Sequence, residues 1–194
     1  QGAYDSALHA YADALDLVST LGKNHRNVAS IRIQMGMVRF QQSQYSLALE
    51  QYRLALSAQR IILGDNHEDV AITLGLIGSV LSFLGRAERA VEFVDRALCI
   101  RQEALGPTHL HVASTLVQLA GLYRVIGKLS ACQECWQDAI DLYHANQLDH
   151  ASPCFEEARA AILFLEKERS KRVSGHSTTE NQEGCMNTNG VVTT

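Results

Sequence analysis

A nine-residue pattern returns along this chain at a fixed interval of 42 residues. It reads LGKNHRNVA at residues 21–29, LGDNHEDVA at residues 63–71 and LGPTHLHVA at residues 105–113. A period between about 20 and 50 residues indicates repeated units, each of which buries its apolar side only against its neighbours. The chain must therefore fold by stacking similar units along one direction.

A second motif lies between the copies of the first. It occupies residues 2–15, 43–56, 85–98 and 127–140. In the second copy a small residue, Ala48, is followed four residues later by the bulky Tyr52 and three residues after that by Ala55. Offsets of four and three place these side chains on one face of an α-helix. We therefore predict a helix in each copy, with small residues that let a neighbouring backbone approach.

The remaining half of each period is predicted to be helical as well. Between residues 70 and 84 the large apolar side chains recur at spacings of three and four, at Leu74, Ile77, Leu81 and Leu84. Residues with good N-cap side chains precede each such helix, at Asn24, Asn66 and Thr108. Glycines suited to a left-handed helix end follow the helices, at Gly22, Gly64, Gly85, Gly106 and Gly127. Each period is thus predicted as helix, tight turn, helix, tight turn.

These elements predict an all-α fold, an α-solenoid of antiparallel helix pairs. Two helices of about 17 residues cannot bury their apolar stripes alone, so successive pairs stack. We divide the array, residues 1–145, into a half repeat at 1–22 and repeats at 23–64, 65–106 and 107–145. Residues 146–172 are predicted to form a capping helix, and the polar residues 173–194 a disordered tail. Since residues 1–22 supply only the second helix of a repeat, we expect further repeats of the same chain upstream.

Composition excludes several functional classes. The 194 residues carry a net charge of −4, whereas a nucleic-acid-binding domain needs a clearly basic face. No apolar run approaches the roughly 20 residues of a membrane span. Five cysteines at irregular spacing fit reduced thiols in the cytoplasm. The sequence contains no phosphate-binding loop or catalytic triad, so we expect no catalytic residue, no cofactor and no enzymatic activity.

Histidines and cysteines are the residues that most invite a metal-site hypothesis. His25, His67 and His109 stand at equivalent places, which puts them at least about 8–10 Å apart. Zinc needs its ligands at about 2 Å, so the three cannot share one ion, and each is predicted to pack at a helix corner and bond a backbone group. Cys132 and Cys135 lie inside a predicted helix, with Cys132 at the small-residue position, and are interpreted as buried side chains. We expect no metal site.

Two arginines are unusual for their positions. Arg32 and Arg39 fall where the other copies have large apolar or aromatic residues, and they share one helix face. One interpretation is structural: they pair with Asp13 or Asp16 of the preceding helix. The other is that they grip a carboxylate or phosphate of a ligand, to which a guanidinium offers two parallel bonds.

Over residues 2 to about 145 the pattern of small, aromatic and alanine positions resembles the tetratricopeptide repeat. The 42-residue period and the LGxxHxxVA link are similar to the longer variety in kinesin light chains and nephrocystin-like proteins. The resemblance implies a right-handed superhelix whose concave groove, lined by the first helix of each pair, binds a peptide or a helix. The groove positions carried over are Ser30, Ile33, Met37, Phe40, Ile72, Gly75, Ser79, Ser82, Ser114, Val117, Gly121 and Arg124.

Ile33, Met37 and Phe40 would give this groove an apolar floor, or alternatively pack between repeats. The chain departs from kinesin light chains at Gly75-Leu76 and Val117-Gln118, where that family carries paired asparagines.

The functional expectation is a non-enzymatic protein–protein interaction module, an adaptor or scaffold of the kinesin light chain type. Its partner would be a protein or peptide, neither nucleic acid nor membrane, and the resemblance implies a cytoplasmic location with cytoskeletal association. An alternative is a regulatory or sensor array of a larger multidomain ATPase or other enzyme. A third possibility is a purely architectural array that joins subunits through its N-terminal face.

Overall fold

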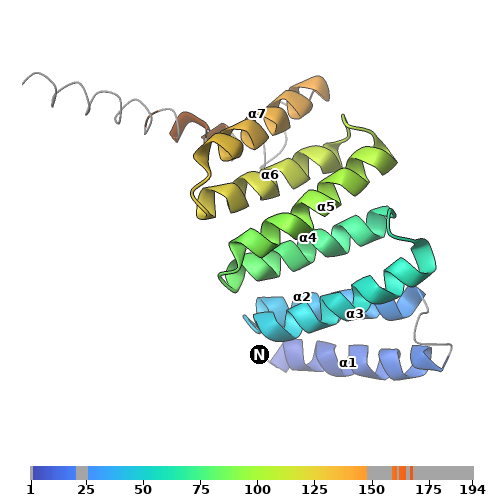
Figure 1. The fold of residues 1–194 in the computed structure, drawn as a ribbon. Helices are drawn as coiled ribbons and strands as arrows, with labels where there is room; N and C mark the ends of the chain where they lie inside the picture. Colours follow the sequence, from blue (N-terminus) through green and yellow to red (C-terminus); the bar gives the residue numbers. More distant parts are fainter. Residues whose placement is uncertain (1, 21–25, 148–158, 161, 165–166, 168–194) are drawn as a thin grey trace, which may run out of the picture.

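The computed structural model describes residues 2–20, 26–147, 159–160, 162–164 and 167, and these residues form helices and turns. Figure 1 shows the helices stacked one above another along the molecule. Their bounds are α1 Gly2–Ser19, α2 Arg26–Gln41, α3 Tyr45–Leu63, α4 Glu68–Phe83, α5 Ala87–Leu105, α6 Leu110–Val125 and α7 Leu129–Ala145. No strand occurs within the described part of the chain, so the predicted all-α class is confirmed.

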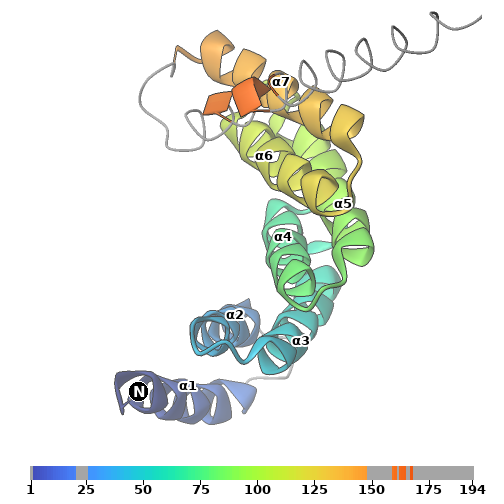
Figure 2. The same ribbon diagram turned by 90° about the vertical axis from the view of Figure 1, so that its left-hand side faces the viewer.

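Helices pack most extensively in the pairs α2–α3, α4–α5 and α6–α7, and less extensively where one pair meets the next. In Figure 2 the first helices α2 and α4 lie on one side of the stack, and the second helices α3 and α5 lie on the other. One cluster of buried apolar side chains runs through the stack from Ala48 to Ile162. The predicted α-solenoid is therefore confirmed.

Small residues set the close packing within each pair. Ala48 and Ala55 are fully buried on α3, and Tyr52 between them is almost fully buried. The ring of Tyr52 lies against Gly36 of α2, where any Cβ would overlap it. Val94 of α5 lies in the same way against Gly78. In these two pairs the bulky side chain of the second helix thus fills the space left by a glycine of the first helix, which explains the small–bulky pattern there.

The helix ends follow the glycine pattern of the sequence. Positive φ angles of 85°, 72°, 89° and 78° occur at Gly64, Gly85, Gly106 and Gly127. The prediction for these four positions is confirmed, and Gly22 lies outside the described residues. A fifth turn uses a serine, because Ser43 has a φ of 59° at the place equivalent to Gly85.

The predicted N-caps were wrong by one residue for two helices. The N-caps of α4 and α6 are His67 and His109, whose Nδ1 atoms accept from the backbone N–H of Asp69 and His111 at 3.1 Å. Asn66, one of the predicted caps, instead accepts a bond from Arg96 at 2.7 Å. An imidazole reaches the second amide of the helix from the position that a shorter side chain would take. The third predicted cap, Asn24, and His25 are among the residues that are not described.

The C-terminal predictions lie mostly outside the described residues. Of residues 146–172 the structure places Ile162 in a helical segment, with its side chain buried against the core cluster. The predicted tail, residues 173–194, is not described. None of the helices in the described part of the chain is long and apolar enough to cross a membrane.

Candidate protein-binding surface

The twelve predicted groove positions all lie on the first helices α2, α4 and α6, but they differ in exposure. Met37 is 41% exposed and Ile72 is 39% exposed, so both offer apolar surface to a ligand. Ser30 and Arg124 are exposed as well. The remaining positions are half-buried: Ile33, Phe40, Gly75, Ser79, Ser82, Ser114, Val117 and Gly121.

One hydrogen-bonded bridge occupies part of the predicted groove. The side-chain Nε2 of Gln118 on α6 donates to the carbonyl oxygen of Gly75 at 2.8 Å and to Oγ of Ser79 at 2.9 Å, both on α4. A Cβ at position 75 would lie 3.3 Å from Oε1 of Gln118, so the glycine leaves room for the amide. Gly75 and Ser79 therefore hold neighbouring first helices together. The sequence marked Gln118 only as a departure from the kinesin light chain asparagines.

Phe40 also packs at a seam. Its ring meets Tyr45 edge-on at 5.3 Å and Phe83 edge-on at 5.1 Å, and the rings of Tyr45 and Phe83 stack at 5.1 Å. These rings come from the end of α2, the start of α3 and the end of α4. Of the two interpretations of Phe40, packing between repeats describes its contacts. The exposed member of the cluster is Phe83, which is 61% exposed and was not among the predicted residues.

The two arginines of α2 bond to neutral amides. Nη1 of Arg32 donates to Oε1 of Gln51 at 3.2 Å, and Nη1 of Arg39 donates to Oε1 of Gln44 at 2.5 Å. These bonds lead to α3 and its N-cap, not to the preceding helix α1, where the predicted partners Asp13 and Asp16 lie. A glutamine satisfies a donor without neutralising the charge, so both guanidinium groups keep the capacity to bind an anion.

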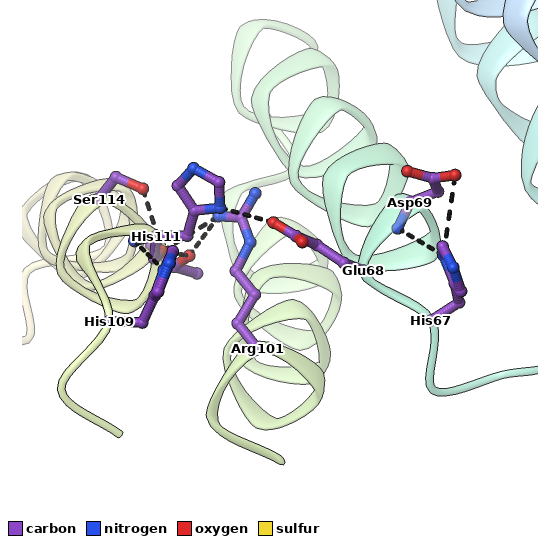
Figure 3. Close-up of polar contacts among 8 residues, drawn as sticks. His67, Glu68, Asp69, Arg101, His109, His111 and Ser114 are labelled. Atoms are coloured by element: carbon purple, nitrogen blue, oxygen red, sulfur yellow. Dashed lines mark hydrogen bonds and ion pairs between the residues drawn. The ribbon is translucent and has the colours of Figure 1, made fainter. Parts of the chain in front are cut away.

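A polar network joins α4, α5 and α6 at one edge of the stack (Figure 3). Nδ1 of His111 lies 2.5 Å from Oε1 of Glu68. Nη1 of Arg101 donates to the carbonyl oxygen of His111 at 3.2 Å and to Oγ1 of Thr115 at 2.5 Å. Burial lowers the pKa of Arg101, and the nearby carboxylate of Glu68 acts in the opposite direction. The network joins two repeats at their seam, although the buried Nε of Arg101 has no hydrogen-bond partner within the described residues.

The repeated histidines act in the same seams. His67 caps α4 by accepting the N–H of Asp69. Oδ2 of the same Asp69 lies 3.5 Å from Nη2 of Arg26 on α2. The predicted bond to a backbone group is confirmed at both His67 and His109. Within the described residues no group of three or more histidine, cysteine, aspartate or glutamate side chains is placed to hold a metal ion.

The buried thiols of α7 have structural positions. Cys132 is fully buried, and Cys135 is 9% exposed. Burial raises the pKa of Cys132, and burial together with nearby acidic groups raises the pKa of Cys135 to about 11. Both side chains are therefore protonated at neutral pH, whereas a metal ligand or redox nucleophile must be a thiolate. The interpretation of the CxxC motif as buried packing is supported.

Comparison with known families identifies the repeat. A family model described as tetratricopeptide repeat matches residues 1–61, 34–103 and 69–145, which together cover most of the chain. A comparison with curated protein sequences finds no significant match.

Several solved structures share this fold. The structure of BtubC (BKLC) from P. vanneervenii has a TM-score of 0.70 at 24% sequence identity, over 78% of this chain and 61% of that one. This chain thus spans less than two thirds of that relative. A putative kinesin light chain from Podosopora anserina, with nearly identical TPR-like repeats, has a TM-score of 0.73 at 16% identity, over 92% and 85% of the two chains. At these identities the likeness shows a common fold.

Proposed function

The chain belongs to the tetratricopeptide repeat family, with repeats of the kinesin light chain type, and we propose that it binds a peptide or a helix of a partner protein along α2, α4 and α6. An array of this family is a protein–protein interaction scaffold. The specific proposal is a binding site on the first helices, at the positions the resemblance assigned to a concave groove.

The observation that carries this proposal is the exposure of apolar side chains on two neighbouring first helices. Met37 of α2 and Ile72 of α4 each expose about two fifths of their surface. Apolar side chains of a ligand helix, spaced three or four residues apart, would cover both. The ligand would lie across the seam between α2 and α4, which the rings of Phe40, Tyr45 and Phe83 hold in place, on rigid helices and not on loops.

The charges of α2 indicate what would flank those apolar side chains. The helix carries Arg26, Arg32 and Arg39 and no acidic residue. Arg26 lies beside Asp69, but the hydrogen bonds of Arg32 and Arg39 go to neutral glutamines. We therefore assign Arg32 and Arg39 to the carboxylates of the ligand, which form charge-assisted bonds with guanidinium groups.

In this proposal the protein is a non-enzymatic adaptor or scaffold in the cytoplasm, associated with the cytoskeleton. Its similarity to kinesin light chain repeat structures supports the adaptor role. The partner is a protein or peptide, and neither nucleic acid nor a membrane surface is involved.

Three variants of closely matched exposure test the site. Met37→Glu and Ile72→Glu place a charge on the proposed surface, and Leu54→Glu places the same charge on the second helix α3, where Leu54 is 40% exposed. The full chain is applied to an array of helical and acidic peptides, and the affinity of each bound peptide is then measured by fluorescence anisotropy. We expect the first two variants to weaken binding roughly tenfold or more, because buried apolar contacts dominate such interfaces.

Leu54→Glu should leave the affinity within about twofold, and all three proteins should keep the parent's helical circular dichroism. If Leu54→Glu weakens binding as much as the other two, or if only Leu54→Glu does, the site on the first helices is refuted.

A further inference from the structure

Two pockets occupy the same place in successive repeats. One is lined by Leu56, Arg60, Asp65, Val70, Leu74 and Arg96. The other is lined by Gln102, Pro107, Val112, Leu116, Asp138 and neighbouring residues of α7. Five positions of the second set follow the first at the 42-residue period: Gln102, Pro107, Val112, Leu116 and Asp138. The two pockets can therefore be compared position by position.

The earlier pocket is filled by the chain's own side chains. Nε of Arg60 donates to Oδ1 of Asp65, and Nη2 of Arg96 donates to Oδ1 of Asn66 at 2.7 Å. The hydrogen bond from Arg60, with the charges of Arg60 and Arg96, holds the pKa of Asp65 below its usual range. These arginines lie over an apolar floor that includes Val70, and the remaining volume is about 60 Å³.

The later pocket has a similar apolar floor but lacks the arginine side chains that fill the earlier pocket. Gln102 and Pro107 stand where the earlier pocket has Arg60 and Asp65, so the ion pair between those two positions is lost. The floor is again apolar, with Val112 1% exposed and Leu116 8% exposed. The volume rises to about 310 Å³.

The charge at the opening is also reversed. Asp138 stands where the earlier pocket has Arg96, and Asp141 follows one helical turn later on the same face. Oδ1 of Asp141 accepts a bond from Gln137 at 2.9 Å, which leaves its second oxygen open to another donor. Within the described residues the side-chain carboxylate of Asp138 has no hydrogen-bond partner. The pocket therefore has an apolar floor under two carboxylates.

We propose that this pocket, which we call the arginine pocket, binds an arginine side chain of a partner protein. The aliphatic part of the arginine would lie on Val112 and Leu116, as long cationic side chains do on apolar surface. Its guanidinium would bond the carboxylates of Asp138 and Asp141. A foreign arginine thus takes the place that Arg60 and Arg96 take one repeat earlier.

The arginine pocket shares no residue with the proposed surface on α2, α4 and α6. A partner that engaged both would be held at two separate points, and its orientation along the solenoid would be fixed. Since the two sites use different residues, either can fail without the other, and their tests give separate answers.

The first test titrates the full chain with N-acetyl-arginine methylamide and follows the methyl resonances of valine and leucine by NMR. The matched neutral probe is N-acetyl-citrulline methylamide, which has nearly the same shape without the charge. We expect saturable shifts at Val112 and Leu116 with the arginine probe, and an affinity about tenfold lower for citrulline. Equal affinity of the two probes, or shifts that bypass Val112 and Leu116, would overturn the proposal.

The second test changes the exposed residues at the pocket opening. Asp138→Asn should lower the affinity for the arginine probe about tenfold, whereas Glu134→Gln, an exposed change elsewhere on α7, should leave it unchanged. The triple variant Gln102→Arg, Pro107→Asp, Asp138→Arg copies the filled pocket of the preceding repeat. It should keep the helical circular dichroism and lose probe binding. Probe affinity that survives in both folded pocket variants contradicts the assignment.

Discussion

At the scale of single residues, the turns after the first helices impose a specific backbone demand. Ser43, Gly85 and Gly127 occupy equivalent places with φ angles of 59°, 72° and 78°. The residue after each turn donates its N–H back to the helix at 2.9 Å, as in the bond from Gln44 to the carbonyl oxygen of Arg39. This geometry needs a left-handed residue. Glycine adopts it readily, whereas the Cβ of serine meets the following carbonyl oxygen.

We therefore predict that Ser43→Gly stabilises the protein. The left-handed conformation disfavours a non-glycine residue by about 1–2 kcal/mol, and glycine loses part of that gain through its greater freedom in the unfolded chain. The expected rise in the free energy of unfolding is about 0.5–1 kcal/mol, measured by urea denaturation. The reverse change, Gly85→Ser, should lower it by a similar amount. A destabilised Ser43→Gly protein would show that the serine side chain supplies a compensating interaction.

At the scale of elements, the starts of α4 and α6 depend on a histidine cap. The Nδ1 atom of His67 accepts the N–H of Asp69, one of the amides that has no partner within α4. Acidic residues Glu68 and Asp69 in the first turn add a favourable interaction with the helix dipole. The imidazole thus acts as the N-cap acceptor, a role that serine or asparagine often has in other helices.

Removing the hydrogen-bond acceptor at position 67 should lower the free energy of unfolding more than replacing it with another acceptor. We predict that His67→Ala lowers the free energy of unfolding by about 1 kcal/mol, because the amide loses its partner. His67→Asn, which keeps an acceptor of suitable reach, should stay within about 0.5 kcal/mol of the parent. Thermal and urea denaturation of both variants measure the difference. Equal losses in the two would mean that packing of the imidazole, and not its hydrogen bond, stabilises this corner.

The helices could be predicted from the sequence where their ends follow the 42-residue repeat. The 42-residue repeat and its glycines locate the ends of α3, α4, α5 and α6, because the same local geometry recurs in each copy. Partners across a seam depend on the rotation and rise of one helix against the next, which periodicity does not report. The bond from Gln118 to Ser79, which joins two repeats, therefore followed from the structure alone.

Exposure was equally hard to anticipate in the candidate site. Met37 and Phe40 are equally apolar in the sequence and three residues apart, yet Met37 is exposed and the ring of Phe40 packs between two others. The arginine pocket was not predicted either. Its two carboxylates are ordinary surface residues in the sequence, and they indicate a binding site only when the pocket is compared with the filled pocket of the preceding repeat.

At the scale of the whole molecule, burial is unevenly distributed along the stack. The core cluster joins α3 to α7 continuously and contains Ile77, which is fully buried. Leu8 of α1 and Val28 of α2 are buried outside that cluster. Among the described helices, α1 packs mainly on α2, and less extensively than α3 packs on α4. In a solenoid each repeat is stabilised by its neighbours, so local stability should follow this distribution.

Hydrogen exchange followed by mass spectrometry tests that expectation through two large-to-small changes. Ile77→Ala removes buried side-chain volume from the continuous core and should lower the free energy of unfolding by about 3 kcal/mol, reducing amide protection throughout α3–α6. Leu8→Ala should increase exchange in α1 and leave protection in α4 and α6 unchanged, because α1 packs mainly on α2 and not on those helices. In the unaltered protein α1 should exchange faster than α4. If Leu8→Ala instead lowers protection in every helix, the described chain unfolds as one cooperative unit, and nearest-neighbour coupling does not describe it.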